Sequence, residues 1–139
     1  MKKIFFVFGI FLSLLVLIFS SCDKTEDSTS PEGDARDVLV GTWVTSETSQ
    51  NFGATTFTLT ISKSTSDKEN IIIRNFYNLG NTTNTIGKVN GTTIILSSQQ
   101  ISSQTIVGSG TFQDGKITWT YNTDDGAGQK DNCSASSTK

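Results

Sequence analysis

Apolar and polar residues alternate along most of the chain after residue 38, and this alternation predicts β-strands. In the run 56–61 the apolar Phe57, Leu59 and Ile61 alternate with threonines, and the run 117–122 alternates in the same way. Successive side chains of a strand point to opposite faces of the sheet, so each run has one apolar face and one threonine-rich face. Threonine suits the outer face because its branched side chain fits a pleated surface.

Turn signals separate these runs and define the order of the strands. Asn90-Gly91 and Asp114-Gly115 are dipeptides that favour tight hairpin turns. The connections are too short for the crossovers that parallel strands need, so neighbouring strands must pair antiparallel. We expect an all-β domain over 38–139, a small antiparallel meander that closes, or nearly closes, into a barrel and so removes its sheet edges. The predicted strands are 39–48, 54–63, 69–77, 83–90, 92–99, 102–113, 116–123 and 129–138.

The first 37 residues differ from this domain. Lys2 and Lys3 precede an uncharged apolar run, 4–19, which is the pattern of a signal peptide that is removed. The alternative is an uncleaved membrane anchor, for which the run is shorter than the roughly 20 residues of a typical span. We therefore predict a leader over 1–21. Residues 22–37 are polar and acidic and hold the single proline, which predicts a flexible tether.

The leader ends in Phe19-Ser20-Ser21-Cys22, which resembles the lipobox of bacterial lipoproteins. The resemblance implies that Cys22 is acylated, for example with palmitate, and becomes the first residue of a lipid-anchored protein. It also implies a location in the cell envelope, which we expect to be the outer membrane of a Gram-negative bacterium. The side of the membrane, periplasmic or surface-facing, stays open.

The start of the predicted barrel carries a second resemblance. Gly41-Thr42-Trp43 is similar to the Gly-x-Trp that opens the barrel of lipocalins and related calycins, and the whole of 38–139 resembles the small lipocalin-like domains of bacterial lipoproteins. In that family the tryptophan packs at the closed end, often under an arginine of the last strand. No arginine follows Arg74 in this chain, so only Lys130 or Lys139 is available for that place.

Composition removes several functions from consideration. The chain has no histidine, the commonest general base and zinc ligand, so we expect neither a catalytic site nor a metal or cofactor site. The net charge is −2 and becomes −4 when Lys2 and Lys3 leave with the leader, which argues against nucleic acid as a partner. With Cys22 acylated, Cys133 has no disulfide partner, and we expect it to be a small buried apolar residue.

These observations favour a binding module over an enzyme. We expect the barrel to hold a small apolar or amphipathic ligand at its mouth, with Arg74, Trp119 and Tyr121 as contacts. The alternative is a solid barrel, filled by its own side chains, that acts as an inhibitor, adhesin or accessory subunit through an envelope protein. An eight-stranded barrel has an interior just wide enough for either arrangement.

Arg74 is the one charged residue in an otherwise apolar predicted strand. It meets a ligand carboxylate or Asp131 if it points inward. If it points outward, Ile72 and Phe76 share its face, and their exposure indicates a contact surface.

Overall fold

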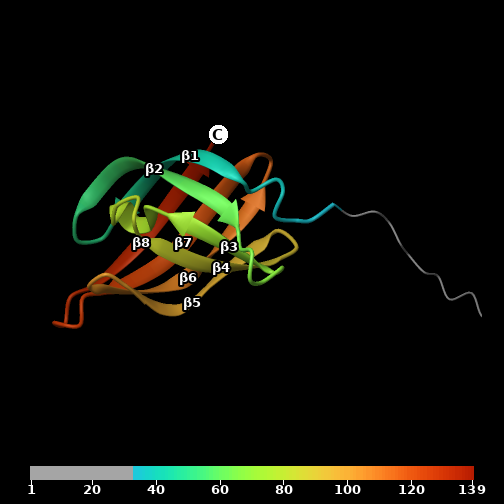
Figure 1. Ribbon diagram of the computed structural model, residues 1–139. Coiled ribbons are helices and arrows are strands. Elements are labelled where there is room, and N and C mark those ends of the chain that lie inside the picture. Colours follow the sequence, from blue (N-terminus) through green and yellow to red (C-terminus); the bar gives the residue numbers. More distant parts are fainter. Residues whose placement is uncertain (1–32) are drawn as a thin grey trace, which may run out of the picture. The chain divides into compact units, whose positions relative to one another are not determined.

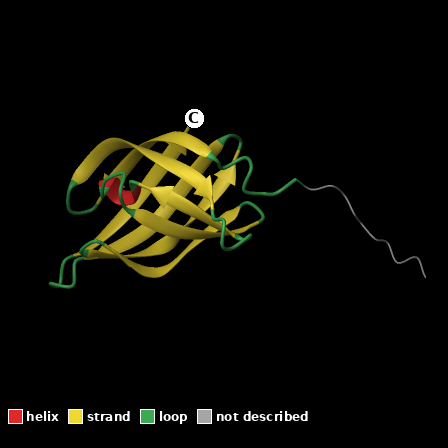
Figure 2. Ribbon diagram, in the orientation of Figure 1, coloured by secondary structure: helices red, strands yellow, loops and turns green. Residues whose placement is uncertain are grey.

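The computed structural model describes residues 33–139, which form eight strands and one short 3-10 turn, η1 (Figures 1 and 2). Each strand pairs antiparallel with the next, and β1 pairs with β8, so the sheet is a closed barrel. The predicted all-β antiparallel meander is confirmed. No helix within 33–139 is long and apolar enough to cross a membrane. The elements are β1 (Gly41–Ser49), β2 (Gly53–Lys63), β3 (Asn70–Arg74), η1 (Phe76–Asn78), β4 (Asn84–Asn90), β5 (Thr93–Ile101), β6 (Gln104–Gln113), β7 (Lys116–Asp124) and β8 (Lys130–Thr138).

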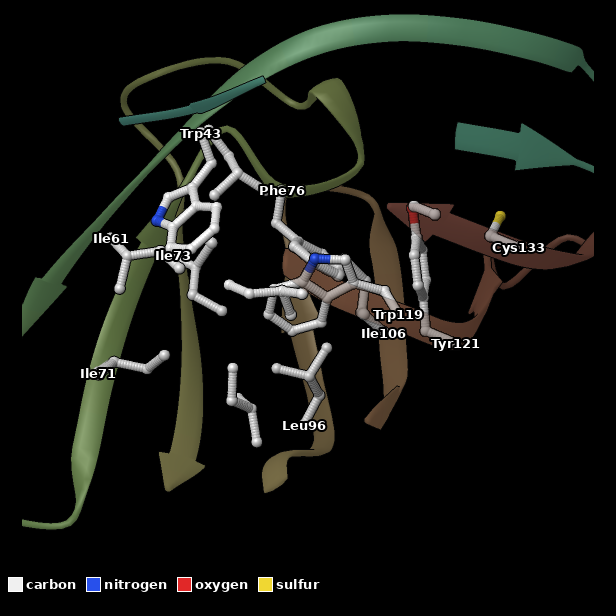
Figure 3. Packing of buried hydrophobic residues seen from close by; sticks show 14 of the residues in the cluster. Trp43, Ile61, Ile71, Ile73, Phe76, Leu96, Ile106, Trp119, Tyr121 and Cys133 are labelled. Atoms are coloured by element: carbon white, nitrogen blue, oxygen red, sulfur yellow. The ribbon is translucent and has the colours of Figure 1, made fainter. Parts of the chain in front are cut away.

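Side chains fill the interior of the barrel (Figure 3). The largest are Trp43 and Trp119, which are 1% and 0% exposed. Phe76 makes edge contacts with Trp119 at a ring separation of 5.2 Å, and Trp43 does the same with Phe112 at 6.2 Å. Contacts of this kind between buried aromatic rings add to the stabilisation from burial itself.

Two glycines of β6 make room for the rings that face them. Gly110 pairs with Trp119 and Gly108 pairs with Tyr121 across the β6–β7 ladder. A Cβ atom at Gly110 would lie 2.5 Å from Cε3 of Trp119, and one at Gly108 would overlap Tyr121. Glycine is therefore required at both positions by the bulk of β7.

One end of the barrel, the tryptophan end, is closed by Leu39, Trp43 and Lys139. The indole of Trp43 donates a hydrogen bond to the carbonyl of Leu39 at 2.8 Å. Lys139 Nζ lies 4.7 Å from the centroid of the Trp43 ring and donates to the carbonyls of Val38 and Val40. Of Lys130 and Lys139, Lys139 is therefore the one that lies over Trp43.

Residues before β1 also pack at the tryptophan end. The buried guanidinium of Arg36 binds Asp34 at 2.7 Å and donates to the backbone carbonyls of Asp67 and Asn70. Lys63 forms ion pairs with both Asp34 and Asp37. These contacts start at Asp34, upstream of the predicted domain boundary at residue 38.

The predicted strand 69–77 was wrong at its C-terminal end, because β3 stops at Arg74. Asn75 has a φ of 60°, a left-handed conformation that ends the extended backbone and starts η1. Its side chain holds the turn by donating to the Thr58 carbonyl and accepting from the Gly80 N–H, both at 2.7 Å. The turn reverses the alternation, so Phe76 is 2% exposed rather than on the outer face with Arg74.

Candidate functional site

The interior end opposite the tryptophan end holds a group of polar side chains, the acidic end, defined by Glu47, Tyr121 and Asp131, which are buried, and Tyr77, which is partly buried. Glu47 points inward because it shares the parity of Trp43 on β1, and Asp131 points inward from the start of β8. The hydroxyl of Tyr121 donates a hydrogen bond to Oε2 of Glu47. Two carboxylates from neighbouring strands therefore lie inside the barrel with the two tyrosines.

The two carboxylates differ in the number of hydrogen bonds that the protein donates to them. Burial raises the pKa of Glu47, the Tyr121 hydrogen bond offsets part of this, and the charge of Asp131 raises it further. Asp131 is also buried, but hydrogen bonds from Ser49 and Tyr77 and from the Asn51 N–H together lower its pKa. The charged form of Asp131 is thus satisfied by donors, while Glu47 has the Tyr121 hydroxyl alone among residues 33–139.

Tyr77 and Phe76 of η1 cover the acidic end. Tyr77 has a φ of 53°, unusual for a bulky residue, and its hydroxyl donates to Asp131 at 2.9 Å. Burial raises the pKa of Tyr77 to about 12, and Asp131 contributes to the same direction. The Phe76 ring lies 4.7 Å from Tyr121. Both side chains therefore contact residues of the acidic end.

Of the three side chains predicted to contact a ligand, two are brought together and Arg74 is apart from them. Trp119 and Tyr121 lie side by side in the interior (Figure 3), where Trp119 donates to Ser137 at 2.9 Å. Arg74 is exposed on the outer face. The alternative pairing of Arg74 with Asp131 is wrong, because Asp131 is inside the barrel. Cys22 lies outside the described residues.

Cys133 is buried, as expected, and it is a free thiol within residues 33–139. Burial raises the pKa of its thiol, and a hydrogen bond to Asp131 raises it further. A thiol in this environment stays protonated and is a poor nucleophile. Within 33–139, no three His, Cys, Asp or Glu side chains are placed to hold a metal ion.

Sequence reasoning missed the polar interior. The inward direction of Glu47 could have been predicted, because every second residue after the inward-pointing Trp43, at positions 45, 47 and 49, faces the interior. Asp131 was harder to place, because β8 has no large apolar residue that marks its inner face. The position of Tyr77 could not have been predicted from the sequence, because it depends on the left-handed turn at Asn75.

Two hollows lie on the outer face of the barrel. One, the Arg74 groove, has a volume of about 600 Å³ and lies between β2 and the segment 74–81. The other has a volume of about 710 Å³, and its lining includes four threonines together with Asp114 and Lys116. Both are open to solvent, unlike the enclosed pockets typical of small-molecule sites.

Comparison with known proteins defines the fold and nothing finer. The chain is similar to the solved structure of a redesigned β-barrel, with a TM-score of 0.56 and 11% identity over 76% of this chain and 95% of that one. At this identity the likeness shows the barrel fold alone. No protein-family profile matches the chain. No curated protein sequence matches it either.

Proposed function

We propose that this protein is a lipid-anchored, non-enzymatic binding module of the bacterial envelope that acts on another envelope protein through its outer surface. The observation that carries the proposal is the filled interior, where Trp43, Phe76 and Trp119 belong to one buried cluster. The two open hollows lie on the outer face of the barrel. A barrel of this kind presents its faces and loops, rather than a cup, to a partner.

The anchor in this proposal is Cys22, through the likeness of Phe19-Ser20-Ser21-Cys22 to a lipobox. Two or more acyl chains hold a protein stably at a membrane, so an acylated Cys22 would keep the barrel in the outer membrane's vicinity, on either side. Cys22→Ala should prevent incorporation of labelled palmitate and release the protein from membranes. Cys133→Ala is the matched control and should leave both unchanged. A Cys22→Ala protein that still incorporates palmitate would refute the anchor.

The likeness to lipocalins gains support from the tryptophan end. Lys139 of the C terminus lies over Trp43 of the Gly41-Thr42-Trp43 motif, in the place that an arginine often has in lipocalins. The likeness concerns the closed end and is compatible with a filled or a hollow barrel.

A second candidate function is the ligand-binding one, with Trp119 and Tyr121 as contacts. The observation that favours it is the segment 75–78, which includes η1, has three left-handed residues and contacts an acidic and aromatic interior. If a ligand displaced Phe76 and Tyr77, it would meet Trp119, Tyr121 and Glu47.

Native mass spectrometry separates the two candidates. The full chain carrying Cys22→Ala would be purified in mild detergent and weighed before and after extraction with organic solvent. The proposal expects the polypeptide mass in both spectra. A further mass that leaves on extraction, and that Trp119→Ala no longer retains, would favour the ligand-binding candidate instead.

A further inference from the structure

Half of β2 has no partner on one side. The strand pairs with β1 from Gly53 to Ile61 but with β3 only from Thr60 to Lys63. The stretch 54–58 therefore has a free edge on the side where β3 would continue. This edge lies within an otherwise closed barrel (Figure 1).

At this edge, the backbone N–H and C=O groups of alternate residues point toward the side where β3 would lie. Ser64 N–H bonds to β3 at Asn70, and the Thr58 carbonyl accepts from the Asn75 side chain, so the even-numbered residues of β2 direct their backbone groups to this side. Within residues 33–139, the backbone N–H and C=O of Ala54 and Thr56 have no hydrogen-bond partner on this side. Unpaired strand edges are templates for a further strand.

The edge is free because the chain leaves the sheet at Asn75. The left-handed turn directs Phe76 into the core, and the Asn75 side chain replaces a strand only at the Thr58 carbonyl. The space that β3 vacates is the Arg74 groove, of about 600 Å³. Its lining includes the three threonines 56, 58 and 60 of β2 and Asn78 of η1.

The charge of the groove is that of Arg74, the single ionisable residue in its lining. The Arg74 side chain is exposed, and it takes part in none of the ion pairs formed among residues 33–139. A guanidinium with five N–H donors is well suited to bind a carboxylate with two hydrogen bonds. The complement of this groove is therefore an extended backbone that carries an acidic group.

We propose that residues 54–58 of β2 bind an extended acidic peptide segment of a partner protein, which adds a strand in the place vacated by β3 and sets a carboxylate on Arg74. This inference rests on the proposed function and names its partner class. Five residues of β2 span about 13 Å, room for a segment of about five residues. Main-chain hydrogen bonds give such a complex its affinity, and the carboxylate gives it selectivity.

A second copy of this chain fits the groove less well. The edge 54–58 and the groove lining contain no carboxylate. Pairing of two such edges would leave both Arg74 side chains without an anionic partner, whereas an acidic peptide satisfies the backbone and the charge together.

The test uses the full chain carrying Cys22→Ala in mild detergent, and a fluorescent seven-residue peptide of alternating Thr and Val with a central Glu, blocked at both ends. Binding would be followed by fluorescence anisotropy and by backbone amide NMR shifts. One control peptide has Lys in place of Glu, and another carries N-methyl groups on alternate residues, which block strand pairing. Arg74→Gln is compared with Lys116→Gln, which removes a basic residue from the other outer hollow.

We expect saturable binding of the Glu peptide, with NMR shifts at Thr56 and Thr58. Arg74→Gln should weaken it about tenfold, Lys116→Gln should leave it unchanged, and N-methylation should abolish it. Arg74→Glu should reverse the preference and favour the Lys peptide. The proposal would be overturned if the peptide did not bind saturably, or if it shifted only the NMR signals of other strands. It would also be overturned if Arg74→Gln bound the peptide equally well, or if the protein dimerised through Thr56 as its concentration rose. A ligand found by native mass spectrometry would contradict the filled barrel but not this result, so the two proposals fail separately.

Discussion

Tyr121 donates its phenolic hydrogen to Glu47 inside the barrel, and the two side chains are 2% and 4% exposed. The contact joins β7 to β1 across the interior. Burial raises the pKa of both groups, so the phenol keeps its proton and the carboxyl gains one more readily than in water. A carboxylate in this position is a cost to stability once it ionises.

Glu47→Gln should increase the free energy of unfolding at pH 7. The raised pKa of Glu47 means that its contribution is full below the ordinary glutamate pKa and falls as pH rises through the folded-state value. Gln accepts the same hydrogen bond from Tyr121 without the charge. Urea unfolding from pH 4 to pH 8 should show the advantage of the variant growing with pH. Glu69→Gln, at an exposed ion pair with Lys88, is the control. An advantage that shrinks with rising pH would contradict the assignment.

Asp131→Asn should have the opposite effect. The lowered pKa of Asp131 means that its contribution is present above the ordinary aspartate pKa and is lost as pH falls through the folded-state value. Ser49 and Tyr77 donate to one carboxylate oxygen of Asp131 and the Asn51 N–H donates to the other. Asn keeps one acceptor oxygen and has an NH2 donor in place of the second, so it cannot accept all three hydrogen bonds. We expect a loss of about 1–3 kcal/mol at pH 7, shrinking in acid, measured by urea unfolding. An unchanged midpoint at pH 7 would count against this role.

Ser137→Ala should destabilise the barrel by about 1–3 kcal/mol. The Ser137 hydroxyl accepts from Trp119 Nε1 at 2.9 Å and bonds to the Thr45 hydroxyl at 2.7 Å. Its removal leaves the buried indole N–H without a partner. Ser136→Ala changes the neighbouring residue on the other face of β8 and should alter stability by less than about 0.5 kcal/mol. Equal effects of the two variants in thermal unfolding would show that the buried hydrogen bonds contribute little.

Gly110→Ala should be among the most damaging single-methyl changes in the barrel. The added Cβ would lie 2.5 Å from the Trp119 ring, which is held on all sides. Overpacking of this kind costs about 1–3 kcal/mol or more, and we expect a large drop in the unfolding midpoint. Ser109→Ala, the outward neighbour, is the control. A Gly110→Ala barrel with an unchanged midpoint and Trp fluorescence would show that β7 can shift.

Thr85→Val should stabilise the protein. The Thr85 hydroxyl is fully buried and has no hydrogen-bond partner within the described chain. Val has nearly the same shape and removes the cost of burying an unpaired hydroxyl, a gain of about 1 kcal/mol. The matched change Thr45→Val removes the bond to Ser137 and should be destabilising. Calorimetry that finds Thr85→Val less stable would reveal a partner for this hydroxyl.

Much of the fold could be predicted from the sequence, because the alternation of apolar and polar residues and the turn dipeptides indicate the same strands. Each of the eight predicted strands overlaps a strand of the barrel, and the Asn90-Gly91 and Asp114-Gly115 turns join β4 to β5 and β6 to β7. The end of β3 was not accessible. Asn75 follows three isoleucines and an arginine that read as one continuous strand, and its left-handed φ depends on side-chain bonds to Thr58 and Gly80.

The features that define the candidate sites depend on distant parts of the chain. The free edge of β2 follows from the early end of β3, and the acidic end joins Glu47 to Tyr121, 74 positions away. Gln99 shows the same dependence: its side chain bonds to both backbone groups of Ile86, where a bulge in β5 interrupts the ladder. Periodicity predicts which face a residue occupies, but not where a neighbouring strand stops.

The pairing of β1 with β8 has a consequence for how the protein is made. The hydrogen bond between Thr45 and Ser137 joins residues 92 positions apart, so the sheet cannot close until residue 137 has been synthesised. Until then β1 and β7 each lack the partner that β8 supplies, so the sheet has two open edges. A chain that stops before residue 130 lacks β8 altogether and would be left as an open sheet, exposed to aggregation and to proteases.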